Sequence, residues 1–480
     1  MCYVWARRLC GPGLPLVGLA WVASTKGNGS GIFQAALPPG TPGFTSLFVD
    51  GVRRTRARWP NGDVTQDSGL CMRRQSAAAQ GWGGFPAWAP TCIEPGANKP
   101  NRTGWSGAGG GFGQRTWPTK PKGIPGNRSR TGPTYTSFNS CTGGAAANFD
   151  PPFNAWCCGG GSGTETGFAM GGPGSNKVPQ QLGTPGQAWT NTDAAVVHMF
   201  HPLKWGGCTY AVGHADTRTG NVSFSGGGQQ NARGCGASTF YVENVLEELD
   251  AEQEWFVSRA GAAGGTGTGT GEGEGGAATL YYKPASGPVA GAGGGSAGGS
   301  APPTAPRHPS SSRFTASVLE TVVRVQGNMS HPVTGLVFDG LTFAHTATTF
   351  LSPYEVPSGG DWAVHRGGAV VVEGAEGITV QNCTFDQPGG NGLLLSNYAR
   401  NCTIVGNEFR GVGDSGVVSL GRAQRLDDPQ DHTDGEFPAG NTVSFNHIHD
   451  YGLFGKQTSC YFQSKSCANT IEFNVCYNGR

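Results

Sequence analysis

The chain has 480 residues, and its 83 glycines and 32 prolines gather in runs that bury too little apolar surface to offset the entropy of ordering them. Thirty-three Lys and Arg residues oppose 32 Asp and Glu residues, so the formal charge of +1 offers no basic field for nucleic acid or an anionic membrane. No apolar stretch reaches the ~18 residues that cross a bilayer, so we expect no membrane span.

Residues 1–30 predict a signal or disordered segment. Arg7 and Arg8 precede the apolar stretch Leu14–Ala23, and small residues follow it. This order is typical of a secretory signal peptide, and a short buried strand is the alternative.

Residues 31–63 predict a β-rich start, because strand-forming residues flank Asp50 and Gly51, a strong hairpin signal. Residues 64–184 then lose periodicity, which predicts a low-complexity insertion that is mostly disordered.

The next segment, 185–286, predicts a β-rich region with one short helix. The helix is expected within Asn244–Glu254, where apolar spacing combines with acidic residues in the first turns. Trp255–Val257 and Thr279–Tyr282 predict paired strands joined by a glycine-rich hairpin. A Gly/Ser/Pro linker, 287–312, separates this region from the last one.

Residues 313–480 carry an internal repeat with alternating apolar residues and asparagine at one fixed position. The repeat units are Ile378–Phe385, Cys402–Phe409, Asn441–Ile448 and Asn469–Cys476. Short strands, apolar alternation and a fixed Asn predict a right-handed parallel β-helix in which Asn amides bond along a column. An antiparallel sandwich explains the alternation but not the Asn register. The last coil stops at Arg480, so we expect a C-terminally incomplete helix.

Extending the repeat aligns Asp414-Ser-Gly with Asp450-Tyr-Gly and places Asn391 one coil earlier. Two carboxylates about 5 Å apart on stacked coils would shift each other's pKa and could act as acid and base. The spacing favours a retaining over an inverting glycosidase. Ordinary turn chemistry at Asp-x-Gly and a calcium site are the alternatives.

Several neighbouring side chains are candidate substrate ligands. His447 and His449 alternate along one predicted strand and therefore share a face, although a solvated pair of turn histidines is the alternative. Trp362 and Tyr451 could stack on sugar rings, although core or loop packing explains most aromatic residues. Lys456 and Arg410 are candidate bases for a lyase.

The cysteines predict no metal site, because the adjacent Cys157 and Cys158 lack a second pair of ligands. Cys460 and Cys467 could close a loop in a polar stretch. Seven Asn-x-Ser/Thr sequons are compatible with a secreted glycoprotein.

Four segments in order resemble the right-handed β-helix proteins related to the glycoside-hydrolase family of bacterial α-L-fucosidases and xylanases. These segments are Leu47–Asn61, Phe240–Phe256, Thr279–Pro284 and Gly335–Phe343. The resemblance covers about residues 31–63 and 190–480. It implies secreted or cell-surface glycan processing with acidic residues on the helix face, for which Asp414 and Asp450 are the candidates.

We therefore expect a monomeric glycoside hydrolase that acts on a plant- or algal-type polysaccharide and needs no cofactor. A non-catalytic glycan-binding or surface structural module is the first alternative. A polysaccharide lyase is the second, and it would use calcium and a basic side chain beside the acids.

Overall fold

The computed structural model describes a little over half of the chain, including nearly all of its C-terminal third. The described residues are 2–4, 13–27, 31–59, 61, 168–169, 188–190, 192, 194–200, 207–216, 221–227, 239–259, 277–286, 307–355, 363–421 and 435–479. Almost all of the 64–184 insertion and most of the 287–312 linker lie outside these ranges.

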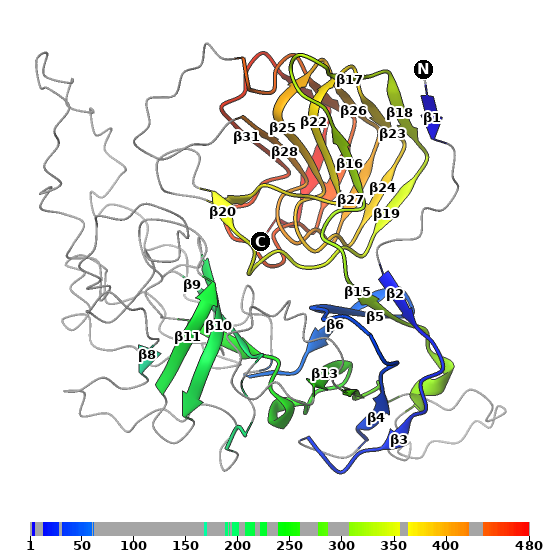
Figure 1. The fold of residues 1–480 in the computed structure, drawn as a ribbon, viewed down its shortest axis with the longest axis vertical. Coiled ribbons are helices and arrows are strands. Elements are labelled where there is room, and N and C mark those ends of the chain that lie inside the picture. Colours follow the sequence, from blue (N-terminus) through cyan, green and yellow to red (C-terminus); the bar gives the residue numbers. More distant parts are fainter. Residues whose placement is uncertain are drawn as a thin grey trace, which may run out of the picture.

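The C-terminal part consists of three parallel sheets that the chain visits in turn (Figure 1). The first sheet contains β16 (Val323–Gln326), β22 (Val370–Glu376), β25 (Leu393–Arg400), β28 (Val417–Leu420) and β31 (Tyr461–Ser464), with β17 (Val333–Thr334) also on β22. The second contains β1 (Cys2–Val4), β18 (Leu336–Asp339), β23 (Thr379–Gln381), β26 (Thr403–Val405), β29 (Thr442–Ser444) and β32 (Thr470–Glu472). The third contains β19 (Thr342–Ala344), β24 (Thr384–Asp386), β27 (Glu408–Arg410), β30 (His447–His449) and β33 (Val475–Tyr477). All-β architecture with parallel sheets is therefore confirmed.

The predicted repeat register holds at the strands of the second and third sheets. Val380 pairs with Ile404, which pairs with Val443, and all three side chains are fully buried. In the third sheet Phe385 stacks on Phe409 with ring centroids 4.2 Å apart. We call one pass of the chain through the three sheets a coil, and the successive coils the stack. Each coil thus places the same kind of side chain inside, so the core extends along the stack.

The predicted asparagine column is present at the turn before the third sheet. The side-chain amide of Asn407 donates to Asn446 Oδ1, and that of Asn446 donates to Asn474 Oδ1, each at 2.9 Å. The same oxygens accept the backbone N–H of the preceding coil's Asn. Asn407 and Asn446 are 1% exposed, so these amides satisfy backbone groups that water cannot reach.

Two further sheets lie beside the coils in Figure 1. The larger, with antiparallel pairing except between β6 and β13, runs β2 (Gly13–Leu16), β15 (Phe314–Ser317), β5 (Ser46–Val49), β6 (Val52–Arg56), β13 (Glu254–Arg259), β14 (Ala278–Tyr282), β4 (Phe33–Ala36) and β3 (Val22–Ala23). The other runs β7 (Arg58–Trp59), β12 (Thr239–Glu243), β9 (Val196–Phe200), β10 (Gly207–Asp216), β11 (Asn221–Gly227) and β8 (Phe168–Ala169). The predicted hairpin at Asp50 and Gly51 and the pairing of Trp255–Val257 with Thr279–Tyr282 are confirmed.

One local expectation differs from the structure. Within Asn244–Glu254 a single 3-10 turn, Leu246–Glu248, forms in place of the expected helix. The turn does not continue into the acidic residues that follow it. Leu14–Ala23 contributes to β2 and β3; Leu16 and Trp21 are buried, whereas both residues of β3 are exposed. No helix in the described ranges could cross a membrane.

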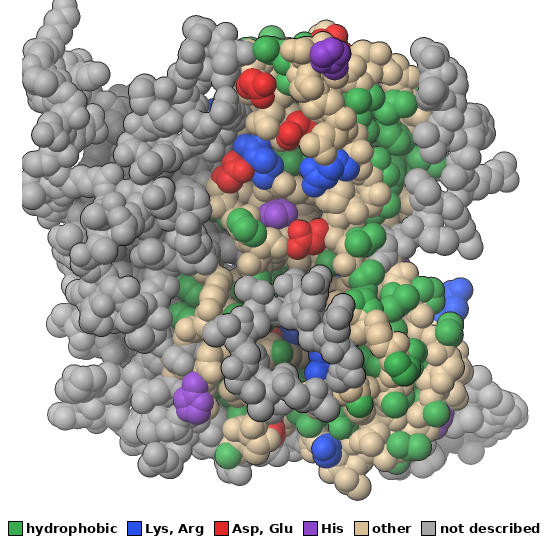
Figure 2. Space-filling model, viewed as in Figure 1, with side chains coloured by type: hydrophobic (Ala, Val, Ile, Leu, Met, Phe, Trp, Pro, Cys, Tyr) green, Lys and Arg blue, Asp and Glu red, His purple; other side chains and the backbone are tan. Residues whose placement is uncertain are grey.

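The charged side chains on the face shown in Figure 2 are of both signs over the coils, so this face carries no field of one sign. This mixed pattern agrees with the near-zero net charge.

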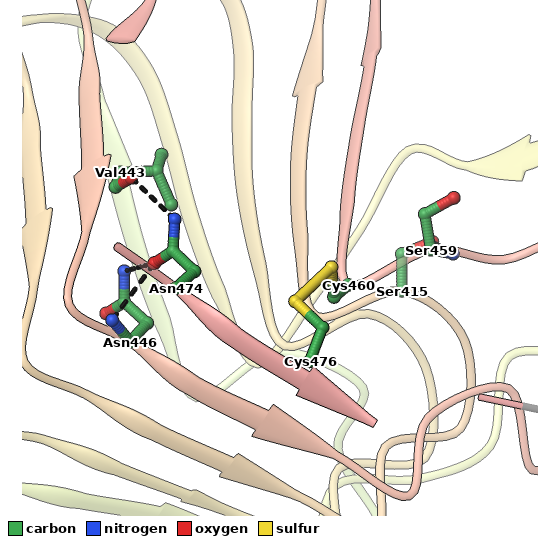
Figure 3. Close-up of a disulfide and its surroundings, with 7 residues drawn as sticks. All are labelled: Ser415, Val443, Asn446, Ser459, Cys460, Asn474 and Cys476. Atoms are coloured by element: carbon green, nitrogen blue, oxygen red, sulfur yellow. Dashed lines mark hydrogen bonds between the residues drawn. A yellow bond between two sulfur atoms is a disulfide. The ribbon is translucent and has the colours of Figure 1, made fainter. Parts of the chain in front are cut away.

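The disulfide also differs from the expectation. Cys460 pairs with Cys476, 16 residues away, and the expected partner Cys467 is free and exposed (Figure 3). Cys476 is in register with the buried Ile448 but is itself exposed, whereas Cys460 packs against the core. The bridge therefore joins β33 to the residue that precedes β31.

Glu254 makes the stability of the larger sheet depend on pH. Burial raises its pKa to about 8, although backbone N–H groups of Asp250 and Ala251 donate to its carboxyl and lower the pKa in part. The unfolded chain ionises this group near its ordinary value of about 4.3, so stability is fully present below that pH and is lost as the pH rises toward 8.

We expect the Glu254→Gln variant to flatten this dependence, because a neutral amide cannot ionise. Thermal unfolding between about pH 4.5 and 8 measures the slope. The exposed Glu252→Gln should keep the wild-type slope. Equal slopes for wild type and Glu254→Gln would contradict the prediction.

Candidate functional site

A small pocket, with about 20 Å³ of space for water-sized molecules, lies where the coils meet the sheet that contains β9 and β10. Residues of β9 and β10, including His198 and Thr209, line one wall. The coils supply Asn391, Asp414 and Ser415, and the segment Phe454–Thr458 supplies another wall. The short hairpin of β20 (Tyr354–Glu355) and β21 (Val364–His365) completes it. Segments far apart in sequence therefore build the pocket together.

Asp414 is the one carboxylate among the described residues that line this pocket. Its side chain is 3% exposed, and its Oδ2 accepts hydrogen bonds from the hydroxyl of Tyr354 at 2.6 Å and that of Thr349 at 3.2 Å. Burial raises the pKa of Asp414, and the Tyr354 hydrogen bond and the nearby His365 partly offset this rise. The site therefore holds a carboxyl group that keeps its proton to a higher pH than usual.

The turn geometry directs Asp414 into the pocket. Its backbone N–H donates to the carbonyl of Gly390 one coil earlier, and its carbonyl accepts from Gly452. The other carboxyl oxygen, Oδ1, has no hydrogen-bond partner among the described residues, although the backbone of Gly455 lies close enough to lower the pKa slightly. A Cβ at Gly455 would lie 2.3 Å from the buried Oδ1, so only a residue without a side chain fits beside this oxygen.

The pKa of His365, beside Asp414, is raised. Its Nδ1 lies 2.9 Å from the carbonyl of Pro353, which can only accept, and its Nε2 lies 3.6 Å from Glu320 Oε2. Burial lowers the pKa of His365, but the Glu320 and Pro353 hydrogen bonds and the charges of Glu320 and Asp414 outweigh burial and raise it. Both ring nitrogens face acceptors, so the imidazolium form fits this geometry.

We expect Tyr354→Phe to shift the pH dependence of any reaction that needs protonated Asp414. The Tyr354 hydroxyl stabilises the charged carboxylate, so its loss raises the pKa of Asp414 further. The alkaline limb of a pH–rate profile should therefore move to higher pH. Tyr398→Phe removes a hydroxyl from the outer surface, where it bonds to Glu376, and should leave the profile unchanged. A uniform loss of rate without a shift would oppose this role.

The structure does not stack Asp450 on Asp414, so the expected pairing of these two acids is wrong. Asp450 follows His449, which is in register with Arg410, and the N–H of Val412 donates to the Asp450 carbonyl. Asp450 therefore lies over Gly411, and Asp414 lies over Gly390. The chain loops out after Asp450 before the next strand begins at Tyr461, which is the register partner of Val417.

Asp450 belongs to a different surface. Its Oδ2 lies 2.7 Å from His449 Nδ1, and its side chain is 40% exposed. Asn478 donates to its Oδ1 at 3.2 Å. His447 and His449 share the outer side of β30, as expected from strand alternation. These three residues form a group apart from the pocket residues around Asp414.

The remaining expected ligands are placed as follows. Asn391 lines the pocket, but its amide donates to the carbonyls of His365 and Gly367 and its Oδ1 accepts from Ser415, so all its polar atoms have protein partners. Tyr451 is partly buried against the coil core. Trp362 lies outside the described residues.

Sequence reasoning did not select His198, Thr209 or His365 for the site. His198 and Thr209 lie on neighbouring antiparallel strands, and their side chains approach at 3.3 Å. Burial opposes ionisation of Glu243 beside His198, yet the charges of His198 and Arg56 lower the Glu243 pKa to about 2. The one sequence signal for His198 was its position within an apolar strand. That position does not reveal which coil the strand faces.

Comparison with known proteins leaves the family open. No family model matches the sequence, and no curated protein matches it. A solved structure described as "Glycoside hydrolase" superposes with a TM-score of 0.48 at 15% identity, over 92% of this chain and 59% of that one. A second, "The complex structure of XylC with xylose", gives a TM-score of 0.28 at 10% identity, over 49% and 38%. The chain thus spans less than two thirds of either structure.

Proposed function

We propose that this protein is a glycoside hydrolase whose general acid is Asp414. The observation that carries the proposal is a buried carboxyl with a raised pKa, one of whose oxygens lacks a partner, inside a pocket of polar and aromatic side chains. Such environments keep an acid protonated to a higher pH than usual, which favours proton donation to a glycosidic oxygen.

The hydrogen bonds to Asp414 assign its proton to one oxygen. Oδ2 accepts from Tyr354 and Thr349, so the acidic proton belongs on Oδ1. Transfer of this proton to the glycosidic oxygen breaks the bond to the anomeric carbon, so the leaving sugar departs as an alcohol and Asp414 becomes a carboxylate. Water adds to the anomeric carbon, and the proton that it loses restores the protonated acid. The Tyr354 hydroxyl and the positive charge of His365 then stabilise that carboxylate. Asp450 lies over Gly411 in another group, so the proposal rests on Asp414 and not on a pair.

Further parts of the proposal concern architecture and setting. We propose that the three parallel sheets wind as a right-handed parallel β-helix, because crossovers between parallel strands are right-handed in about 98% of cases. The substrate class proposed is a polysaccharide or glycan, and the setting is secreted or at the cell surface. The Cys460 to Cys476 disulfide supports an oxidising compartment.

A polysaccharide lyase is the second candidate, because one observation favours it. Lys456 is 4% exposed and lines the pocket together with Asp414. A lyase abstracts a proton beside a uronic carboxylate, for which a buried lysine could serve as base.

Product analysis separates the two chemistries. The purified chain is incubated with xylan, fucosylated glycans and a polyuronate, and the products are examined by ultraviolet absorbance and NMR. New reducing ends without unsaturation support the hydrolase, whereas an unsaturated product supports the lyase. The absence of both products across this panel would contradict both proposals and favour a glycan-binding module.

A further inference from the structure

A second group of side chains with metal-ligand chemistry lies on the outer surface of the third sheet. Glu408 belongs to β27, and His447 and His449 belong to β30 on the next coil. Glu408 is the register partner of His447, so the strand pairing itself brings the three together. Phe409 and Ile448 alternate with them and fill the core, which fixes the direction of the outer side chains.

The distances fit a small divalent ion. One ligand atom from each of Glu408, His447 and His449 lies within 4.8 Å of the others. His449 Nε2 is 3.6 Å from Glu408 Oε1. Tetrahedral zinc with bonds of about 2.0–2.1 Å holds its ligands roughly 3.4 Å apart, so small side-chain rotations close the site.

The hydrogen bond at the other side of the His449 ring gives an independent reason. Asp450 Oδ2 lies 2.7 Å from Nδ1, and a carboxylate can only accept, so Nδ1 carries a proton. Nε2 faces Glu408 Oε1 and is buried without a hydrogen-bond partner. A lone pair on Nε2 would repel the carboxylate unless a metal ion or a proton lay between them.

The neighbours of the group leave this position open to a cation. The Arg410 Nη1 atom lies 3.6 Å from Glu408 Oε2, and its Nε lies 2.9 Å from Asp386 Oδ1. The other Glu408 oxygen, Oε1, therefore remains directed at His449. Tyr477 stacks on the His449 ring, and its hydroxyl lies 3.0 Å from His447 Nε2. These contacts hold both rings in place, as a preorganised metal site requires.

We propose that Glu408, His447 and His449 bind a zinc-class divalent ion, with Asp450 as a positioning residue. Two His and one Glu with an open fourth position are a known zinc set, and a carboxylate on the distal ring nitrogen is its usual support. The ion joins two consecutive coils on a surface separate from the Asp414 pocket. This inference is therefore independent of the proposed hydrolase activity.

The test uses the full chain, freed of metal by a chelator and titrated calorimetrically with zinc chloride. We expect one strong equivalent per chain and a rise in the unfolding temperature with zinc. Cobalt(II) chloride in the same site should give the intense visible absorption of a tetrahedral complex.

The variants identify the ligands. Glu408→Gln and His449→Asn should each weaken zinc binding at least 100-fold and abolish the cobalt spectrum, and Asp450→Asn should weaken binding about 10- to 100-fold. His331→Asn changes an exposed histidine elsewhere and should bind as wild type does. No strong equivalent in the wild type, or unchanged binding in Glu408→Gln and His449→Asn, would overturn the proposal and leave a protonated His449 paired with Glu408.

Discussion

Asp414→Asn should abolish glycan hydrolysis while leaving the fold intact. The amide oxygen can still accept from Tyr354 and Thr349, so the hydrogen bonds at Oδ2 survive. An amide cannot donate an acidic proton to a leaving group, and loss of a general acid lowers rates by about 10²- to 10⁴-fold. The loss should appear in kcat, since the pocket walls are unchanged. Circular dichroism and the unfolding temperature should remain close to the wild type.

A matched variant separates acid catalysis from a general loss of charge. Asp339→Asn makes the same chemical change on the outer surface, where Asp339 accepts from Gln381 and Asn382. It should retain wild-type kcat. A substrate with an activated leaving group, such as a nitrophenyl glycoside, needs less protonation and should be affected less by Asp414→Asn. Equal losses on both substrates would argue against the acid role.

The second large effect concerns the asparagine column. Asn446→Leu removes the acceptor for the backbone and side chain of Asn407 and the donor to the Ile404 carbonyl. Each buried group left unpaired costs about 1–3 kcal/mol, and neighbouring groups are not additive. We therefore expect a loss of about 3 kcal/mol or more in the free energy of unfolding, measured by urea denaturation.

The control for this variant is an asparagine at an exposed turn. Asn382 has a φ of 53°, a conformation that glycine adopts readily, and its side chain bonds only at the surface. Asn382→Gly should therefore change the free energy of unfolding by less than about 0.5 kcal/mol. A comparable loss in both variants would show that the column contributes no more than a turn.

The coil stack was predictable because its interactions follow the repeat. Val380, Ile404 and Val443 fall at one place of the sequence pattern and at one place of the structure. The larger sheet beside the coils had no such signal. Its β15 pairs with β5 across more than 260 residues, as in Phe314 with Val49, and no periodicity links those segments. Pattern reasoning finds local and repeated contacts, so it found the β5–β6 hairpin and the β13–β14 pair in this sheet but not its long-range pairings.

The candidate site also combines residues that the repeat predicts with residues that it does not. Asp414 was found because it follows a repeat unit, and it does line the pocket. Asp450 was assigned the equivalent position because both residues begin an Asp-x-Gly sequence, but the extra loop after Asp450 delays the next strand to Tyr461. The ordinary turn alternative describes Asp450 better, since it has a φ of 53°. Tyr354 and His365 reach Asp414 through an excursion whose folding the repeat does not specify.

The wide separation of the pocket walls has a consequence for the order of folding. Within residues 323–479, coils pair with coils 24 to 47 residues away, as in Cys383 with Asn407 and Val323 with Val370, so the stack can grow one coil at a time. The larger sheet must instead close a loop of 199 residues between Trp255 and Arg56, and the sheet that contains His198 a loop of 183 residues between Val242 and Trp59. Such closure is slow. A refolding chain would therefore place Asp414 on an early, stable platform. The opposite wall with His198 would join it late, so the proposed activity would trail the recovery of β-structure.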